Sequence, residues 1–279
     1  MGIVSLCDAV GSAHRDGRAV PAFNVVDDVS MAAVLDIAEH VREPVIVQMS
    51  TRTAKFWRPE VVLATFRAMT AVRQVDATLH LDHCQDPGLI TECLQLGWNS
   101  ALYDASHLPY DQAIGSTREL VRTARRMGAD IEGETQPIRS VADLECHSPI
   151  EHAADLSAAF IEATGVCCFS PDIGTAHGKY DEEPVLRTDI LRTLAARTGV
   201  PLVLHGASGL SAEALREAIT CGIRKINFST ALKSAYLWPM RKGAAQPVDA
   251  PLELLGSIKE SVRDAVAECI GLVTGGVGA

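Results

Sequence analysis

The chain has 279 residues, 47% of them hydrophobic and 22% charged, which is enough to bury a large core. Its formal charge is −10, and it has neither a basic run nor an apolar stretch of about 20 residues, so we expect no binding to nucleic acid and no membrane span. Eight cysteines without a C-x-x-C pair, and an N-terminus without a signal-peptide pattern, predict a cytoplasmic protein with free thiols.

Short runs rich in strand-forming residues alternate with amphipathic runs along the chain. A helix over 5–17 is expected before the first strand. Strands are then expected at 19–25, 44–50, 77–83, 100–106, 130–136, 166–174, 201–208 and 223–230. The helical runs are 29–42, 61–74, 87–97, 116–128, 153–165, 189–199 and 211–222, followed by a loop at 243–253, a helix at 252–273 and a frayed tail at 274–279. This order predicts the α/β class and one domain over residues 1–279: a (β/α)₈ TIM barrel with an N-terminal capping helix and a C-terminal helical extension.

Polar residues gather where the predicted strands end, which is where such barrels build their active sites. In chain order they are Asn24, Ser50, Asp82, His83, Asp104, Ser106, Glu132, Glu134, His177, Gly178, His205, Asn227, Ser229 and Thr230. A lone histidine is more often structural than a ligand, and the other six histidines are interpreted in that way. Three histidines at three strand ends, with a carboxylate from a fourth, predict a Zn²⁺ site with an open position.

Small residues surround two of these histidines, in "AHGKY" and "HGASG". Small residues let backbone N–H groups approach an anion closely. Each glycine loop alone could be a plain turn. Together with the two hydroxyls of "NFST" at 227–230, they predict a phosphate site near the last two strands.

Four motifs in this order, "LHLDH", "GTAHGKY", "PLVLHGASGL" and "KINFST", resemble the class II, metal-dependent ketose-bisphosphate aldolases, which act on fructose or tagatose bisphosphate. The resemblance covers most of the chain, from "PAFNV" to "INFSTALKSAY". It implies a lyase of carbohydrate metabolism that handles dihydroxyacetone phosphate, a small sugar phosphate as partner, and a homodimer or homotetramer.

The resemblance also implies a role for each matching residue. His83, His177 and His205 match the zinc ligands, Glu134 matches an alternative ligand, and Asp104 matches an acid near a second cation. Asp82 matches the acid/base at the aldol hydroxyl, and Asn227 matches the residue that holds the enediolate. Gly178, Gly206, Ser208, Ser229 and Thr230 match the phosphate cradle, while Asn24 and Ser50 match polar positions on the substrate side.

Two departures from the family pattern stand out. The chain reads "DHC" where family members read "DHG", which places Cys84 beside a predicted ligand. After the fifth strand, "EGETQPIRSVADLECHSPIEH" lacks the glycine-rich loop whose glutamate exchanges the C1 proton of dihydroxyacetone phosphate. Asp143, Glu145 or His147 could replace that base, and Glu145 is favoured because its side chain is longer. The alternative is that all three are solvated loop residues.

The leading hypothesis is therefore a zinc-dependent aldolase that uses or releases dihydroxyacetone phosphate. One alternative is a specialised aldolase with a different acceptor aldehyde. Another is a non-catalytic barrel that binds metal or sugar phosphate as a subunit of another enzyme. A Schiff-base mechanism through Lys179 or Lys225 ranks low, because neither lysine explains the three histidines.

Overall fold

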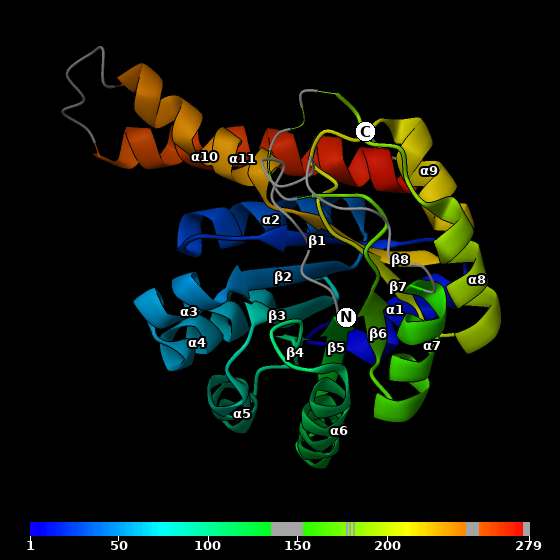
Figure 1. The fold of residues 1–279 in the computed structure, drawn as a ribbon. Coiled ribbons are helices and arrows are strands. Elements are labelled where there is room, and N and C mark those ends of the chain that lie inside the picture. Colours follow the sequence, from blue (N-terminus) through cyan, green and yellow to red (C-terminus); the bar gives the residue numbers. More distant parts are fainter. Residues whose placement is uncertain (135–152, 177, 179, 181, 244–250, 276–279) are drawn as a thin grey trace.

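Eight parallel strands close into a barrel in chain order, from β1 to β8 (Figure 1). The computed structural model describes residues 1–134, 153–176, 178, 180, 182–243 and 251–275. The strands are β1 (Val20–Asn24), β2 (Val45–Ser50), β3 (Ala77–Cys84), β4 (Ser100–Asp104), β5 (Asp130–Glu134), β6 (Cys168–Ser170), β7 (Leu202–Leu204) and β8 (Ile223–Phe228). The prediction of a single-domain (β/α)₈ barrel is confirmed.

Helices surround the barrel, and most of them lie close to the predicted helical runs, although α6 begins at Tyr110 instead of residue 116. They are α1 (Leu6–Arg15), α2 (Asp28–Val41), α3 (Thr51–Trp57), α4 (Pro59–Ala71), α5 (Pro87–Leu96), α6 (Tyr110–Arg126), α7 (Ala153–Thr164), α8 (Thr188–Thr198), α9 (Ala212–Thr220), α10 (Thr230–Gly243) and α11 (Pro251–Thr274). Side-chain caps start several of them; Asp86 accepts hydrogen bonds from two backbone N–H groups at the start of α5. Glycine in the left-handed conformation ends α5 and α8.

Alternate strand residues face the helices or the barrel interior, because side chains alternate across a strand. The outward-facing set, such as Phe23, Val47 and Leu79, joins the helices in the main hydrophobic core. At the N-terminal ends of the strands, Leu6 and Val10 of α1 pack against inward-facing residues in a separate apolar cluster. Helix α1 therefore closes that end of the barrel, which leaves the opposite end for a site.

Two helices were not predicted. Helix α3 follows β2 directly, and Ser50 caps it by accepting from the Thr53 backbone N–H. Helix α10 starts inside the "NFST" motif, and Pro239 interrupts its sequence pattern. It runs side by side with α11, and this pair projects beyond the barrel (Figure 1). Most of the predicted loop at 243–253 and of the predicted tail lies outside the described residues.

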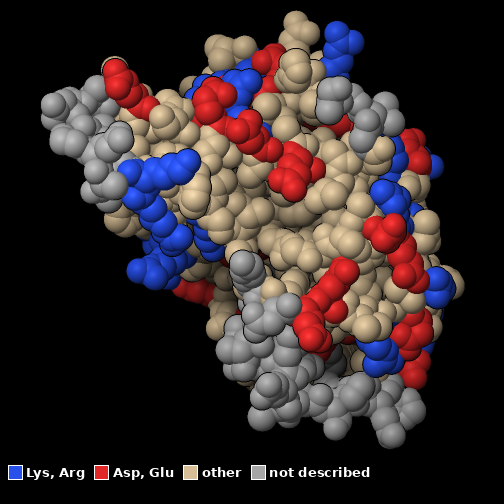
Figure 2. All heavy atoms as spheres, turned by 90° about the horizontal axis from the view of Figure 1, so that it is seen from above, with Lys and Arg blue, Asp and Glu red and all other residues tan. Residues whose placement is uncertain are grey.

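The surface in Figure 2 is of mixed charge: basic side chains cluster at the left edge and are scattered along the top and right edges, and acidic side chains lie among them and across the centre. Among the residues that the structure describes, no helix is both long and apolar enough to cross a lipid bilayer.

Candidate active site

A pocket of about 380 Å³ lies at the C-terminal ends of the strands. Its described lining consists of Asn24, Ser50, Asp82, His83, Gly178, Gly206, Ser208, Asn227, Ser229, Thr230 and Lys233. All of these except Lys233 were predicted as site residues. The volume suits a small-molecule ligand.

Asp82 and His83 are adjacent in β3, yet both line this pocket. In a regular strand two neighbours would point to opposite faces. Here the pairing of β3 with β4 shifts register between Leu81 and Cys84, and His83 has a φ of 48°. This irregularity turns the imidazole toward the barrel mouth. A non-glycine residue in the left-handed region costs about 1–3 kcal/mol, and such strain clusters at functional sites.

The imidazoles of His83 and His205 meet edge to face, with His83 Nε2 and His205 Nδ1 2.9 Å apart. The other ring nitrogen of His205 lies 3.0 Å from Glu132 Oε1 and 3.1 Å from Asn227 Nδ2. Because Glu132 is fully buried and its second oxygen accepts from Lys225 Nζ at 2.6 Å, its position is constrained. The carboxylate thereby orients His205 so that Nδ1 faces the pocket.

Asp82 is almost fully buried and is held from one side by amides. Asn24 Nδ2 donates to Asp82 Oδ2 at 2.7 Å, and Gln48 Nε2 in turn donates to Asn24 Oδ1 at 2.8 Å. The other Asp82 oxygen, Oδ1, is buried and accepts no hydrogen bond from the described residues. Asn24, predicted on the substrate side, is thus also the residue that orients Asp82.

The Asp82 carboxyl is ionised at neutral pH. Burial raises its pKa, but the neighbouring His83, His205 and Lys225 side chains and the hydrogen bond from Asn24 outweigh burial and lower the pKa from 3.8 to about 2. His80, one level deeper in the barrel, behaves differently. Burial and the nearby Lys225 charge lower the pKa of His80 well below 6.5, so its ring is neutral and bonds to Ser100 Oγ. This fits its predicted structural role.

The donor atoms at the mouth fit a divalent metal ion. One ligand atom each from Asp82, His83 and His205 lies within 4.8 Å of the others. Two nitrogen ligands of a tetrahedral zinc ion are roughly 3.3 Å apart, so the observed pair of ring nitrogens needs only a small opening. The buried Asp82 Oδ1 atom, which accepts no hydrogen bond within the described part of the chain, adds negative charge beside this pair.

A second group of donors shares one of these histidines. Glu134 Oε2 lies 3.5 Å from His83 Nδ1, and Asp104 completes a set whose ligand atoms lie within 4.8 Å of one another. Gln85 Nε2 donates to one Asp104 oxygen at 2.7 Å, while the Ser106 backbone N–H donates to the other at 3.0 Å. The structure thus brings Asp104 and Glu134, predicted near a second cation and as an alternative ligand, close to His83.

The far end of the pocket is suited to an anion. Ser229 and Thr230 lie at the start of α10, where backbone N–H groups have no partner within the helix. Ser208 Oγ accepts from the Ala231 backbone N–H at 3.3 Å, which ties the loop after β7 to this helix start. Lys233, one turn into α10, adds a positive charge and was not among the predicted site residues.

Tyr180 joins the two glycine loops of the site. Its hydroxyl contacts both the N–H and the carbonyl of Ala176 and the carbonyl of Gly206, at 2.8, 2.8 and 2.9 Å. Gly206 has a φ of 68°, and a Cβ built there would lie 2.3 Å from the Ala176 carbonyl oxygen. The loops after β6 and β7 therefore approach as closely as glycine permits.

Four predicted residues lie outside the described part of the chain: His177, Asp143, Glu145 and His147. Cys84, the departure next to His83, is buried in the main core, and its thiol faces the Asp86 carbonyl at 3.4 Å. The Cys84 sulfur thus points away from the ligand cluster.

Three supporting residues were missed or given another role. Glu132 was noted only as a strand-end acid, Gln48 was not singled out, and Lys225 was weighed as a Schiff-base lysine. Lys225 is fully buried and ion-paired below the site, and does not line the pocket. Strand alternation could have indicated Glu132 and Lys225. Residues 132 and 134 point to the same face of β5, and residues 225 and 227 point to the same face of β8.

The profile described as "Fructose-bisphosphate aldolase class-II" matches residues 4–276. Among solved structures, the YdjI aldolase from Escherichia coli K12 is 27% identical, with a TM-score of 0.83 and 97% of each chain covered. A "putative fructose-1,6-biphosphate aldolase" from Coccidioides immitis is 25% identical, with a TM-score of 0.88 over 98% of this chain and 96% of that one. The fructose-bisphosphate aldolase (Fba) from Campylobacter jejuni, 20% identical, shares the fold, with a TM-score of 0.81 over 98% and 96% of the two chains. The profile match over nearly the whole length places this chain in the class II fructose-bisphosphate aldolase family.

Proposed function

We propose that this protein is a zinc-dependent aldolase that cleaves or forms a ketose (bis)phosphate, with dihydroxyacetone phosphate as one product or substrate. The observation that carries the proposal is the position of Asp82. A buried, ionised carboxylate lies beside two converging imidazoles at one end of a pocket whose other end is the N-terminus of α10. A site for binding alone has no need of a proton acceptor at that point.

His83 and His205, with His177 from the sequence motif, are the residues that would hold the ion. A bound Zn²⁺ ion would polarise the ketose carbonyl and stabilise negative charge on its oxygen. Glu132 keeps His205 in the tautomer with hydrogen on Nε2, so that Nδ1 is the available ligand atom. His83 belongs to both groups of donor atoms, and Glu134 would serve as an alternative ligand for the ion.

Asp82 moves the proton. In the cleavage direction its Oδ1 atom accepts the hydrogen of the aldol hydroxyl as the C–C bond breaks, and in the condensation direction it returns that hydrogen. A pKa of about 2 keeps the accepting form populated at neutral pH. Asn24 holds the other oxygen, so only Oδ1 is directed to substrate.

The phosphate group would bind at the start of α10. Ser208, Ser229 and Thr230 supply hydroxyl groups, the helix N-terminus supplies N–H groups, and Lys233 supplies charge. Anchoring the phosphate there places the reacting carbons between the anchor and Asp82. Asn227 Nδ2, already within 3.1 Å of His205 Nε2, lies where it can donate to the oxygens of the dihydroxyacetone unit.

The base that removes the C1 proton of dihydroxyacetone phosphate would come from the loop after β5, with Glu145 favoured. Exchange of that proton with solvent deuterium, measured without aldehyde, tests this step. Glu145→Ala should stop the exchange, whereas a wild-type rate in Glu145→Ala, Asp143→Ala and His147→Ala would place the base elsewhere.

The main test is coupled cleavage of fructose and tagatose 1,6-bisphosphates, with and without a chelator. Chelation should abolish turnover while circular dichroism stays unchanged, and Zn²⁺ should restore it. Asp82→Asn should lower kcat by about 10²–10⁴-fold with unchanged zinc content. Asp111→Asn, at an exposed position of α6, is the matched control.

The outcomes separate the three hypotheses. Turnover only with other aldehydes in a condensation panel would indicate a specialised aldolase. Zinc and phosphate binding without C1 exchange or cleavage of any ketose phosphate would indicate a binding subunit. Loss of zinc in Asp82→Asn would make Asp82 a ligand instead of a proton carrier.

A homodimer or homotetramer is part of the same proposal. The projecting α10–α11 pair exposes large apolar side chains: Leu237, Trp238, Leu252 and Leu255 are 40%, 54%, 82% and 39% exposed. Light scattering after size-exclusion chromatography checks the assembly, and a monomer at working concentration would contradict it.

A further inference from the structure

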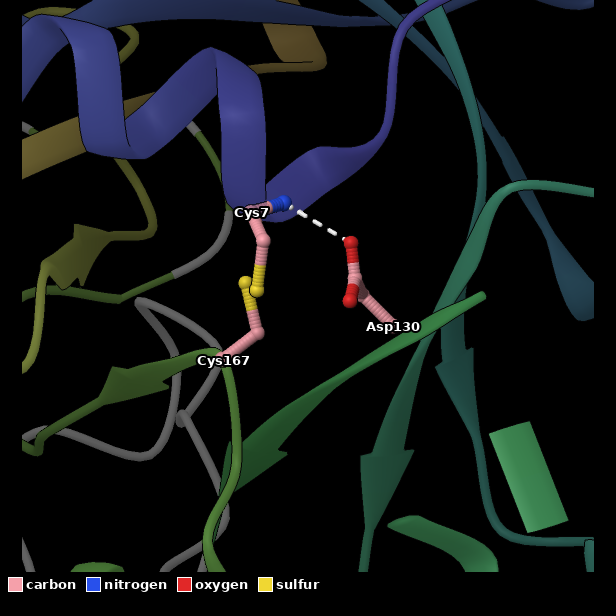
Figure 3. A group of neighbouring side chains, drawn as sticks. All are labelled: Cys7, Asp130 and Cys167. Carbon is pink, nitrogen blue, oxygen red and sulfur yellow. Dashed lines mark hydrogen bonds between the residues drawn. The ribbon is translucent and has the colours of Figure 1, made fainter. Parts of the chain in front are cut away.

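Three side chains whose donor atoms are common metal ligands meet at the end of the barrel opposite the active site (Figure 3). Cys7 lies in the first turn of α1, Asp130 is the first residue of β5, and Cys167 directly precedes β6. One ligand atom of each lies within 4.8 Å of the other two. The sulfur atoms of the two cysteines point toward each other, with the Asp130 carboxylate beside them.

The backbone around this cluster holds the three groups in place. The Cys7 N–H donates to Asp130 Oδ2 at 2.8 Å, and the Cys167 N–H donates to the Ile131 carbonyl at 2.9 Å. Leu6, next to Cys7, is fully buried in the apolar cluster beneath the barrel. The cluster therefore rests on three ordered elements, and the exposed Cys7 side chain leaves a route from solvent.

The chemistry of the three donors fits a thiophilic divalent ion. Two thiolates and a carboxylate are ligands that Zn²⁺ accepts, and two sulfur ligands of a tetrahedral zinc ion are roughly 3.8 Å apart. That spacing lies within the 4.8 Å spread of the cluster.

The surroundings of Cys167 oppose formation of its thiolate when no cation is bound. Hydrogen bonds with the Cys168 and Cys7 thiols, burial, and the Asp130 charge together raise the pKa of Cys167 well above 9. A divalent ion reverses this balance, because it attracts all three anionic groups at once.

We propose that Cys7, Asp130 and Cys167 form a second metal site, for zinc or another thiophilic divalent ion, with water on the exposed side. Binding forms two metal–sulfur bonds and one metal–oxygen bond. The two thiols release their protons to solvent, and nothing is oxidised or reduced. The bound ion fastens α1 to the starts of β5 and β6, so its role is structural. This inference does not depend on the proposed aldolase activity.

Cobalt provides the probe, because sulfur ligands give Co²⁺ an intense near-ultraviolet charge-transfer band that histidine and carboxylate ligands lack. Metal-free full-length protein, reduced and kept free of oxygen, is titrated with Co²⁺. Because the active site should take one ion as well, we expect the band to be complete at two equivalents of Co²⁺ per chain in wild type and at one equivalent in His83→Ala/His205→Ala, and we expect Zn²⁺ to displace it. Cys7→Ser and Cys167→Ser should each lose most of it, and Asp130→Asn should weaken Co²⁺ binding at least tenfold.

Two controls separate this site from the active site. The double variant His83→Ala/His205→Ala should keep the band, and Cys269→Ala, which removes a buried thiol in α11, should keep it as well. Cys7→Ser should retain wild-type ketose cleavage. Absence of the band in wild type, or its persistence in Cys7→Ser/Cys167→Ser, would overturn the proposal.

A thiol assay tests the competing chemistry. In wild type, Zn²⁺ should slow the reaction of two thiols per chain with an aromatic disulfide reagent. In Cys7→Ser/Cys167→Ser, Zn²⁺ should slow the reaction of no thiol. If Cys7 and Cys167 instead form a disulfide with each other at the same rate with and without Zn²⁺, the cluster is a redox pair and the metal site is refuted.

Discussion

Gly206 directly follows His205, and its replacement by alanine should disturb the whole mouth of the barrel. The new methyl group would lie 2.3 Å from the Ala176 carbonyl oxygen and 2.8 Å from the Tyr180 hydroxyl. Contacts below 3.0 Å are essentially never observed, so the backbone after β6 must move by roughly 0.7 Å in this close-packed region. Ala176 immediately precedes His177, and the displacement therefore reaches two predicted zinc ligands.

Two terms set the expected loss of stability in Gly206→Ala. Left-handed backbone costs alanine about 1–2 kcal/mol, and overpacking adds about 1–3 kcal/mol. A loss of 1 kcal/mol lowers the melting temperature by roughly 2–4 °C in a protein of this size. Misplacement of a reacting group by about 1 Å can reduce the rate about 10²-fold, so we expect kcat/KM for ketose cleavage to fall by that order.

Gly199→Ala is the matched control, because Gly199 has a φ of 63° and a Cβ there meets nothing within 4 Å. It carries the backbone strain without the collision and lies at the end of α8, away from the site. Melting curves and the coupled cleavage assay should therefore show a moderate loss of stability and wild-type turnover for Gly199→Ala. Equal stability and equal kcat/KM in the two variants would refute the steric reasoning.

Three further changes test the supports of the barrel. Tyr180→Phe leaves backbone groups of the loops after β6 and β7 without their hydroxyl partner, so chemical denaturation should show a loss of about 1–3 kcal/mol. Lys225→Met leaves the Glu132 carboxylate buried without its cation and should cost about 3–5 kcal/mol, whereas adding Glu132→Gln should recover part of that loss. Burial raises the pKa of Asp36, but hydrogen bonds from Lys259 and from a neighbouring arginine outweigh it and lower the pKa below 3.8. Stability from Asp36 is thus complete above its unfolded pKa and is lost as pH falls through the folded pKa. Asp36→Asn should accordingly be less stable than wild type at pH 7, with the difference shrinking below about pH 4.

Strand and helix order could be predicted from periodicity alone, because each βα unit repeats one pattern of apolar residues. The two missed helices have local reasons. Ser50 is both the last residue of β2 and the N-cap of α3, so no loop residue separates the strand from the helix in the sequence. In α10, Pro239 breaks the helical pattern, and the "NFST" motif at its start is typical of a loop.

Most residues of the pocket were predicted because strand ends converge in a closed barrel, whereas Ser208 was predicted from the resemblance to the family and Lys233 was missed. The interactions among them could not be predicted. Nothing in the sequence indicates that β3 shifts register at His83, or that Glu132 lies between His205 and Lys225. The meeting of Cys7 with Cys167 depends on how α1 closes the barrel, a contact between residues 160 positions apart.

The pairing of the first strand, β1, with the last, β8, has a consequence for synthesis on the ribosome. Val20 of β1 pairs with Lys225 of β8, and α11 then packs across α2 beside this pair of strands. At about 5–20 residues per second, β1 waits roughly 10–40 s for that partner to be made. During this interval the nascent chain has an unpaired strand edge and an uncovered apolar face on α2, both prone to aggregation. The ring can close only near the end of translation, so a chaperone that shields the growing sheet should raise the yield of native protein more than one that acts after release.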